Sequence, residues 1–339
     1  MKILYAIQGT GNGHLSRAND IVPLLKKKVE TDVLVSGIQA DVESPFQIDF
    51  RYNGLSFIFG KKGGVDIWDT LRRSDLPKLW REIVNFPVTD YDLVINDFEP
   101  VSSWAASLKN VPCISLSHQA AVLSENAPKP RSTDWIGVAT LKYYAPVNFK
   151  YGFHFKRYNE NVFTPVIRQQ IRDLARSDHG HYSVYLPAYG DETLIRSLSR
   201  FPNVRWEVFS KHTKGSYEKD NVFIKPIENE AFIKSMASSE GVLCGAGFET
   251  PAEALFLGKK LAVLPMKTQY EQQCNAAALE EMSVPVFRDL SEINLPLIGK
   301  WIESDERIVV NYEDHTEEVV DIVLNRHFFS RSAGGMKTA

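Results

Sequence analysis

Residues 242–276 read VLCGAGFETPAEALFLGKKLAVLPMKTQYEQQCNA. This stretch begins with a short hydrophobic run, turns at two glycines and continues into a helix-forming segment at 250–258. A second hydrophobic run follows at 261–264, and a second helical segment follows at 270–281. Short buried strands that alternate with single helices are typical of a parallel sheet with crossover helices. The stretch therefore predicts part of a parallel α/β domain.

The same alternation runs through both halves of the chain. We predict strands at 3–7, 32–35, 93–95, 111–116, 183–186, 204–209, 222–224, 241–244 and 261–264, and helices at 15–28, 101–108, 167–177, 191–200, 229–237, 250–258 and 270–281. Because one core seldom serves 339 residues, we expect two Rossmann-like α/β domains whose parallel sheets face each other across a cleft. The expected domains are 1–165 and 166–329, followed by a disordered tail at 330–339.

The composition is that of an ordinary soluble globular protein, with 44% hydrophobic and 24% charged residues. The net charge of -3 gives no reason to expect a nucleic-acid partner. The three cysteines are widely separated, which predicts neither a disulfide framework nor a zinc site. No apolar run has the length of a signal-peptide core or a membrane span, so we expect a cytoplasmic protein. Lysines 26–28 indicate the solvated end of a helix or, alternatively, peripheral contact with an anionic membrane.

A glycine loop follows the first predicted strand and opens a helix. It reads Gly9-Thr10-Gly11-Asn12-Gly13-His14. The dinucleotide fingerprint needs a glycine where His14 stands, and the second strand lacks the acidic residue that holds a ribose, so NAD binding is disfavoured. The glycines still allow a ligand to approach the backbone, and a helix N-terminus favours an anion.

His14 is the first candidate for chemistry. A histidine is the usual general base near neutral pH, and ligands of open α/β sheets bind at the carboxyl ends of the strands. Asp97 follows the strand at 93–95 at the same edge, where its carboxylate can orient the imidazole. The alternatives are a packing or capping role for His14 and an N-cap role for Asp97. His118 and Gln119 follow another strand at this edge.

The second glycine turn, at 245–247, also stands at a helix start, where a diphosphate can bind. Thr250 and Glu253 have the spacing of a capping box, which is a structural alternative for both residues. The polar loop at 264–276 carries amide and carboxylate side chains that suit the hydroxyls of a sugar.

These motifs together resemble those of UDP-glycosyltransferases of the GT-B fold. The similarity is greatest to MurG-type N-acetylglucosaminyltransferases and to bacterial enzymes related to UDP-glucuronosyltransferases. The resemblance is carried by the glycine turn, Thr250, Glu253-Ala254, Gly258, Pro265, Glu271-Gln272 and Asn275-Ala276, and also by the N-terminal glycine loop, His118-Gln119 and the segment 232–236.

The resemblance implies a role for each matched residue. His14 would deprotonate the acceptor hydroxyl, with Asp97 as its orienting partner. The acceptor side would also include Gly11, Asn12, Gly13, His118 and Gln119. The donor nucleotide would meet Phe232, Ile233, Met236, Gly245, Gly247, Phe248, Glu249, Thr250 and Glu253, with Glu253 on the ribose. Glu271 and Gln272 would hold the donor sugar. Glu249 departs from the family pattern, because its charge would repel two phosphates unless it points away.

The implied function is transfer of a sugar from a nucleotide diphosphate, with UDP expected, to an acceptor hydroxyl. Retaining GT-B enzymes of the large sucrose-synthase-like group carry a glutamate eight positions before the one matched by Glu253; here that position is Gly245, which favours inversion. Helix dipole and backbone amides would stabilise the leaving diphosphate, so we expect no metal and no cofactor besides the nucleotide-sugar co-substrate. A sugar-nucleotide 2-epimerase and a non-catalytic sugar-nucleotide-binding protein are the alternatives.

The acceptor is not specified by these motifs; a lipid-linked molecule and a glycan both fit. Residues 142–158 are rich in aromatic and basic side chains. They indicate either a surface for a lipid-linked or aromatic acceptor, or the last strand and linker of the N-terminal domain.

Overall fold

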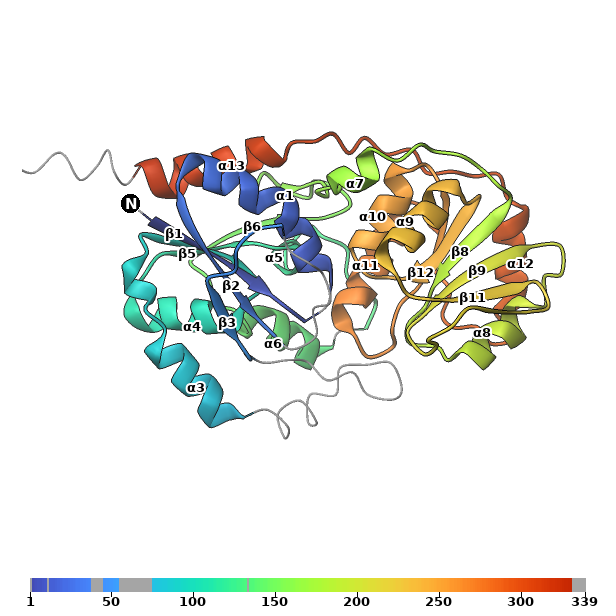
Figure 1. Cartoon of the computed structure of the whole chain (residues 1–339), viewed down its shortest axis with the longest axis horizontal. Helices are drawn as coiled ribbons and strands as arrows, with labels where there is room; N and C mark the ends of the chain where they lie inside the picture. Colours follow the sequence, from blue (N-terminus) through green and yellow to red (C-terminus); the bar gives the residue numbers. More distant parts are fainter. Residues whose placement is uncertain (1, 11, 38–44, 55–74, 133, 331–339) are drawn as a thin grey trace, which may run out of the picture.

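The computed structural model describes residues 2–10, 12–37, 45–54, 75–132 and 134–330, which form two α/β domains side by side (Figure 1). The N-terminal domain contains a parallel sheet in the order β3-β2-β1-β4-β5-β6-β7. Its strands are β1 (Lys2–Gln8), β2 (Glu30–Ser36), β3 (Phe50–Tyr52), β4 (Leu93–Asp97), β5 (Cys113–Leu116), β6 (Phe149–Phe153) and β7 (Val162–Phe163). Its helices are α1 (Asn12–Lys28), α3 (Leu76–Asn85), α4 (Pro100–Lys109), α5 (His118–Val122) and α6 (Trp135–Tyr143), with a 3-10 turn at Val88–Asp90.

The C-terminal domain contains the second sheet, in the order β10-β11-β9-β8-β12-β13. Its strands are parallel except for the short edge strand β10. They are β8 (His181–Tyr185), β9 (Arg205–Ser210), β10 (Tyr217–Lys219), β11 (Val222–Pro226), β12 (Gly241–Gly245) and β13 (Lys260–Leu264). The helices are α7 (Gln169–Arg172), α8 (Asp191–Leu198), α9 (Asn229–Ser238), α10 (Glu249–Phe256), α11 (Tyr270–Glu281) and α12 (Leu295–Glu303).

Every strand that the hydrophobic runs predicted is present. The reason is visible in β1, where residues 3–7 are fully buried, because helices cover both faces of a parallel sheet and leave no polar side. The polar helix expected at 167–177 is wrong: α7 covers only Gln169–Arg172. Beyond it, the backbone N–H groups of Ser177 and His179 donate instead to the carbonyl oxygens of Ala237 and Ser238 at the end of α9.

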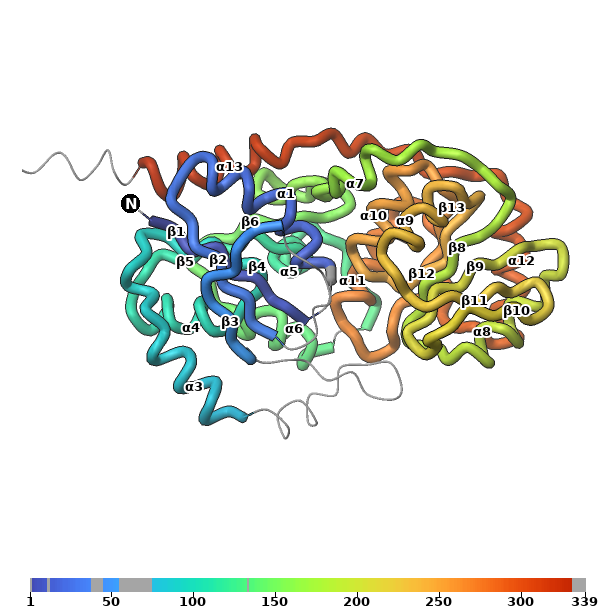
Figure 2. The backbone as a smooth tube through the Cα atoms, in the orientation of Figure 1, coloured from blue at the N-terminus to red at the C-terminus, as the bar shows by residue number. Residues whose placement is uncertain are grey.

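The chain crosses between the domains after β7 and returns after α12, on one side of the molecule (Figure 2). The returning segment forms α13 (Thr316–Leu324) and a π-helical turn at Asn325–Phe329. Helix α13 packs along α1, where Lys28 forms ion pairs of 2.9 Å with Glu317 and Asp321 (Figure 1). The expected domain 166–329 therefore needs a correction, because its last helix belongs spatially to the N-terminal domain. Of the expected tail, 331–339 lie outside the described residues.

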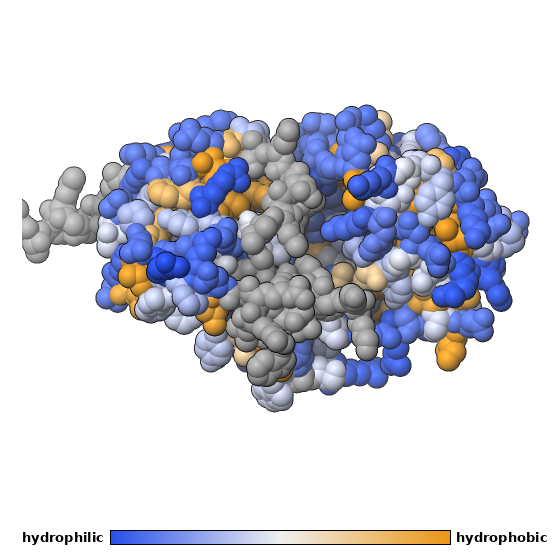
Figure 3. Space-filling model, turned by 60° about the horizontal axis from the view of Figure 1, so that its bottom comes forward, coloured by the Kyte–Doolittle hydropathy of each residue, from blue (hydrophilic) through white to orange (hydrophobic). Residues whose placement is uncertain are grey.

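The aromatic stretch at 142–158 is mainly core. Tyr151, Phe153 and Phe155 are buried in or beside β6, whereas Tyr143 is exposed. This agrees with the interpretation as a last strand and linker. On the face shown in Figure 3, hydrophobic residues are scattered among hydrophilic ones. Among the described residues, no helix is long and apolar enough to span a membrane.

Candidate active site

The two sheets present their carboxyl edges to a shared cavity of about 330 Å³. Strand β4 pairs with β1 in the N-terminal sheet, which brings Asp97, the last residue of β4, next to the glycine loop after β1. In the C-terminal domain, the turn after β12 and the loop after β13 supply the opposite wall. The cavity lies between the domains, as the sequence predicted for the cleft.

His14 and Asp97 form the expected pair. The His14 Nδ1 atom lies 2.8 Å from Asp97 Oδ1, and Asp97 is fully buried. Because a carboxylate only accepts, a neutral imidazole at this position carries its proton on Nδ1 and its lone pair on Nε2. The Gln119 amide nitrogen lies 3.4 Å from Nε2, and His14 lines the cavity. A substrate hydroxyl in this cavity would therefore meet the basic nitrogen.

The alternative role of Asp97 as a helix cap is wrong. Helix α4 begins at Pro100, and the side chain of Glu99 accepts hydrogen bonds from the backbone N–H groups of Val101 and Ser102. Glu99 therefore satisfies the N-terminus of α4, and Asp97 is left for His14. The helix α1 also begins earlier than expected, at Asn12, which places His14 in its first turn.

Arg17 is a site residue that the sequence reasoning missed. It is buried, and its Nη2 donates to both oxygens of Asp97 at 2.9 and 2.8 Å. Burial alone would raise the pKa of Asp97, but the charges of Arg17 and His14 outweigh that effect and lower the pKa below its usual value. The available signal was spacing, because Arg17 stands three positions after His14 and so shares its helix face.

Arg17 also reaches across the cavity. Its Nη1 donates to Glu249 Oε1 at 2.5 Å, so one guanidinium holds a carboxylate from each domain. Burial raises the pKa of Glu249, although Arg17 and His14 oppose that shift. Glu249 points toward the N-terminal domain, where a Cβ atom on Gly13 would lie 3.3 Å from its carboxylate.

The capping box expected at Thr250 and Glu253 is wrong. Helix α10 begins at Glu249, and no side chain caps it. Glu253 is buried and accepts two bonds from Arg168, at 2.5 Å from Nε and 2.8 Å from Nη2. Arg168 donates in addition to Asn229. Glu253 is not among the residues that line the cavity, so its contact with a ribose stays a prediction.

Glu271 lines the cavity as expected, whereas Gln272 does not. The Glu271 carboxylate accepts a hydrogen bond of 3.0 Å from Gln119, which links the two walls. Gln272 is buried, and its side-chain oxygen accepts from the backbone N–H of Met266. On this wall the amide side chain that lines the cavity is that of Gln269, whose buried oxygen has no partner among the described residues.

His118 lines the cavity but is held on both ring nitrogens. Nδ1 lies 2.8 Å from the carbonyl oxygen of Phe153, and Nε2 lies 2.7 Å from Oδ1 of Asn275 in the opposite domain. The ring stacks on Phe248 at a centroid distance of 4.0 Å. Burial lowers its pKa. These contacts make His118 a connection between the domains and leave its nitrogens unavailable as a base.

The remaining predicted positions divide into three groups. Gly13, Gly247 and Thr250 line the cavity. Phe232, Ile233 and Met236 do not, because α9 buries them in the hydrophobic core, and Gly245 at the end of β12 is likewise not part of the wall. Gly11 lies outside the described residues, as does the side chain of Asn12.

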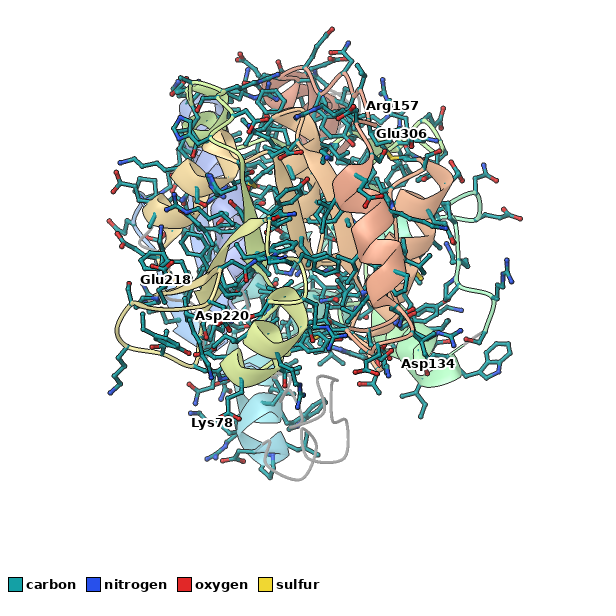
Figure 4. All side chains as sticks on the ribbon, turned by 90° about the vertical axis from the view of Figure 1, so that its right-hand side faces the viewer. Lys78, Asp134, Arg157, Glu218, Asp220 and Glu306 are labelled. Atoms are coloured by element: carbon teal, nitrogen blue, oxygen red, sulfur yellow. The ribbon has the colours of Figure 1, made fainter. Side chains whose placement is uncertain are left out.

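The N-terminal wall also contains an apolar section that was not anticipated. Phe98 and Leu141 line it together with Thr140 and Asp134, which stands at the start of α6 (Figure 4). Phe98 adopts a φ of 58°, a conformation that is unusual for a bulky side chain and that is found mainly where surrounding structure enforces it. The cavity therefore offers an acceptor both apolar surface and hydroxyl partners.

Among the described residues, no group of three or more His, Cys, Asp and Glu side chains could hold a metal ion. The sequence contains one Asp-x-Asp, at residues 90–92. It lies at the amino edge of β4, where Asp92 accepts a bond from the backbone N–H of Lys2, on the opposite side of the sheet from the cavity.

The model of glycosyl transferase family 1 matches residues 1–304 of the chain. The chain belongs to this family. It is a glycosyltransferase, and its two facing Rossmann-like domains are the GT-B fold. No curated protein matches the sequence significantly.

Solved structures with the same fold include enzymes of different activity. MurG of Acinetobacter baumannii aligns with a TM-score of 0.56 at 12% identity, over 96% of this chain and 100% of that one. Arabidopsis thaliana UGT89C1 complexed with UDP aligns with 0.56 at 13%, over 96% and 94%. A UDP-N-acetylglucosamine 2-epimerase aligns with 0.58 at 15%, over 97% of each chain. At these identities the likeness concerns the fold alone.

Proposed function

We propose that this glycosyltransferase transfers the sugar of a UDP-sugar to an acceptor hydroxyl, with inversion at the anomeric carbon and without a metal ion. The observation that carries the proposal is the position of His14. Its Nδ1 faces the buried carboxylate of Asp97, and its Nε2 faces a cavity shared by both domains. A hydroxyl is a poor nucleophile at neutral pH, so a fixed base in the cleft is what direct transfer needs.

The reaction balances in one step. The acceptor oxygen forms a bond to the anomeric carbon while its proton passes to Nε2 of His14. The bond between that carbon and the diphosphate oxygen breaks, and its electron pair leaves with the diphosphate. Asp97 stabilises the imidazolium that forms. The turn at the start of α10 supplies the positive end of a helix dipole for the charge that develops on the leaving group.

The donor and acceptor sides follow from the two walls. Gly247 and Thr250 would meet the diphosphate, and Glu271 would accept bonds from hydroxyls of the donor sugar. UDP as the carrier is supported by the fold shared with a plant enzyme bound to UDP. Phe98 and Leu141 favour an acceptor with an apolar group next to its hydroxyl, such as a lipid-linked molecule.

Donor choice is tested first by thermal shift with UDP, GDP, dTDP and CDP. A nucleotide at a hundred times its Kd stabilises the folded state by about 2.7 kcal/mol, and a weaker ligand at the same concentration stabilises it less. At one common concentration, UDP should therefore raise the melting temperature most. Transfer is then measured as UDP release from UDP-sugars, with and without an acceptor panel that includes lipid-linked and soluble glycans. We expect acceptor-dependent release, unchanged by a chelator, and a product of inverted anomeric configuration by NMR.

Isomerisation of the donor sugar without any acceptor would show that the protein is a 2-epimerase. Binding of UDP-sugars without release or isomerisation across the panel would favour a sugar-nucleotide-binding protein. A product with retained configuration would contradict His14 as the base of a direct displacement.

A further inference from the structure

Arg17 stands between the catalytic pair and the expected diphosphate turn. Its Nη2 binds Asp97 of its own domain, and its Nη1 binds Glu249, the first residue of α10. Its Nε is buried and has no acceptor among the described residues. Within that part of the chain, Arg17 is the one lysine or arginine that lines the cavity. A diphosphate entering the cavity would meet this guanidinium as the one lysine or arginine partner that the described residues offer.

Glu249 occupies the position of an anion. Its carboxylate lies against Gly13 in the first turn of α1 and bonds Arg17, while its own backbone opens α10. Helix N-termini attract anions, and arginine binds carboxylates and phosphates with the same geometry. The carboxylate thus accepts the hydrogen bond from Arg17 Nη1 that a phosphate oxygen at the same place could accept.

Donor and Glu249 cannot both keep these partners. The donor brings two phosphate charges to the start of α10, where Glu249 stands, and a carboxylate beside them would be repelled. Of the two carboxylates that Arg17 bonds, Glu249 is held less firmly. Its side chain is 21% exposed and burial raises its pKa, whereas Asp97 is fully buried and its pKa is lowered. The contact that can exchange is therefore the one between Arg17 and Glu249.

We propose that Arg17 is the phosphate-binding cation of this glycosyltransferase and that Glu249 takes the place of the diphosphate until the donor arrives. The inference rests on the proposed function. On donor binding, Nη1 of Arg17 exchanges the carboxylate of Glu249 for a phosphate oxygen. When the bond to the anomeric carbon breaks, the diphosphate gains one negative charge, which Arg17 stabilises next to the proton received by His14.

The test compares Glu249→Gln and Arg17→Gln with wild type, using isothermal titration with UDP, inorganic pyrophosphate and uridine. Because Glu249→Gln removes the competing anion, this variant should bind UDP and pyrophosphate about tenfold more tightly than wild type. That factor corresponds to the lower end of the free energy of a hydrogen bond to a charged group. Arg17→Gln should weaken both by about tenfold to hundredfold. Uridine, which has no phosphate, should bind all three proteins alike.

The double variant tests the mechanism. Because Glu249→Gln acts by releasing Arg17, its gain should largely disappear when Arg17 is already Gln. The matched control is Glu240→Gln, which breaks an ion pair of 2.8 Å with Lys260 at the opposite edge of the same sheet and should leave UDP affinity unchanged. Arg17→Gln removes the positive charge beside the buried carboxylate of Asp97 and can therefore destabilise the protein. The result for Glu249→Gln, at a partly exposed residue, does not depend on the stability of Arg17→Gln.

Unchanged or weaker UDP and pyrophosphate binding in Glu249→Gln would overturn the inference and leave the proposed donor intact. If wild type binds neither ligand but Glu249→Gln binds pyrophosphate, the inference holds and the assignment of UDP is wrong. If none of the proteins binds either ligand, both are wrong.

Discussion

The two glycine turns that face each other across the cleft occupy equivalent places in their domains and differ in chemistry. Each follows a parallel strand at its carboxyl end and opens a helix, α1 in one domain and α10 in the other. The first turn leads to His14, which its own domain fixes through Asp97. The second leads to Glu249, whose carboxylate is bonded by Arg17 of the opposite domain. The side chain after the first turn is thus fixed within its own domain, whereas the side chain after the second turn is bonded by the opposite domain.

This difference separates the roles of the two carboxylates. Asp97 makes three short contacts and is fully buried, so it behaves as a permanent anion that holds His14. Glu249 has one contact with Arg17 and keeps partial exposure, so replacing it requires little of the surrounding structure. The variants below test whether the first turn serves the chemistry and the second serves the donor.

The largest effect is expected for His14→Ala. Loss of a general base typically costs about 10²–10⁴ in rate, whereas UDP affinity should stay the same because none of the proposed donor contacts involves His14. The measurement is the initial transfer rate next to UDP affinity by titration. The exposed His212→Ala serves as a control for the residue type and should match wild type. Full transfer activity in His14→Ala would refute the assignment of the base.

Asp97→Asn sharpens the same prediction. Weakening a charged hydrogen bond costs about 1.5–3 kcal/mol, so the rate should fall about tenfold to hundredfold, less than in His14→Ala. The combined variant should be little slower than His14→Ala alone, because the two residues act as one unit. Independent, multiplying losses would contradict that coupling.

The sequence predicted nine of the strands, the cleft and the pairing of His14 with Asp97, because buried parallel strands are read from hydrophobic runs and their carboxyl ends meet at one edge. It did not predict the other contacts between distant segments. Arg168 pairs with Glu253, which has the spacing of a cap, and Gln272 turns away from the cavity although it follows Glu271 directly. The return of α13 to the N-terminal domain depends on contacts with α1 that no local pattern signals.

A smaller effect separates two roles of Glu253. Glu253→Ala and Arg168→Ala each break the same buried pair, which typically costs about 3–5 kcal/mol of stability. If the carboxylate also binds the ribose, only Glu253→Ala should lower UDP affinity, by about 1.5–3 kcal/mol. Melting temperature and UDP titration are measured for both variants. Equal UDP affinity in the two would mean that Glu253 serves only the ion pair.

The smallest effect compares the glycines of the two turns directly. Apart from its two chain neighbours, no described residue has an atom within 4 Å of a Cβ built on Gly247, so the space above it is open to a ligand. A Cβ atom on Gly13 would instead press on the carboxylate of Glu249. Gly247→Ala should leave the melting temperature equal or slightly higher, since alanine stabilises by about 0.4–1 kcal/mol where the backbone allows it. Its methyl group would nevertheless crowd the diphosphate and reduce UDP affinity by about 1 kcal/mol, or about fivefold.

Gly13→Ala should not reduce UDP affinity, because the group it displaces is the one that the donor must displace as well. Thermal melting and UDP titration of both variants decide the matter: an equal loss of affinity in the two would contradict the division between a catalytic turn and a donor turn.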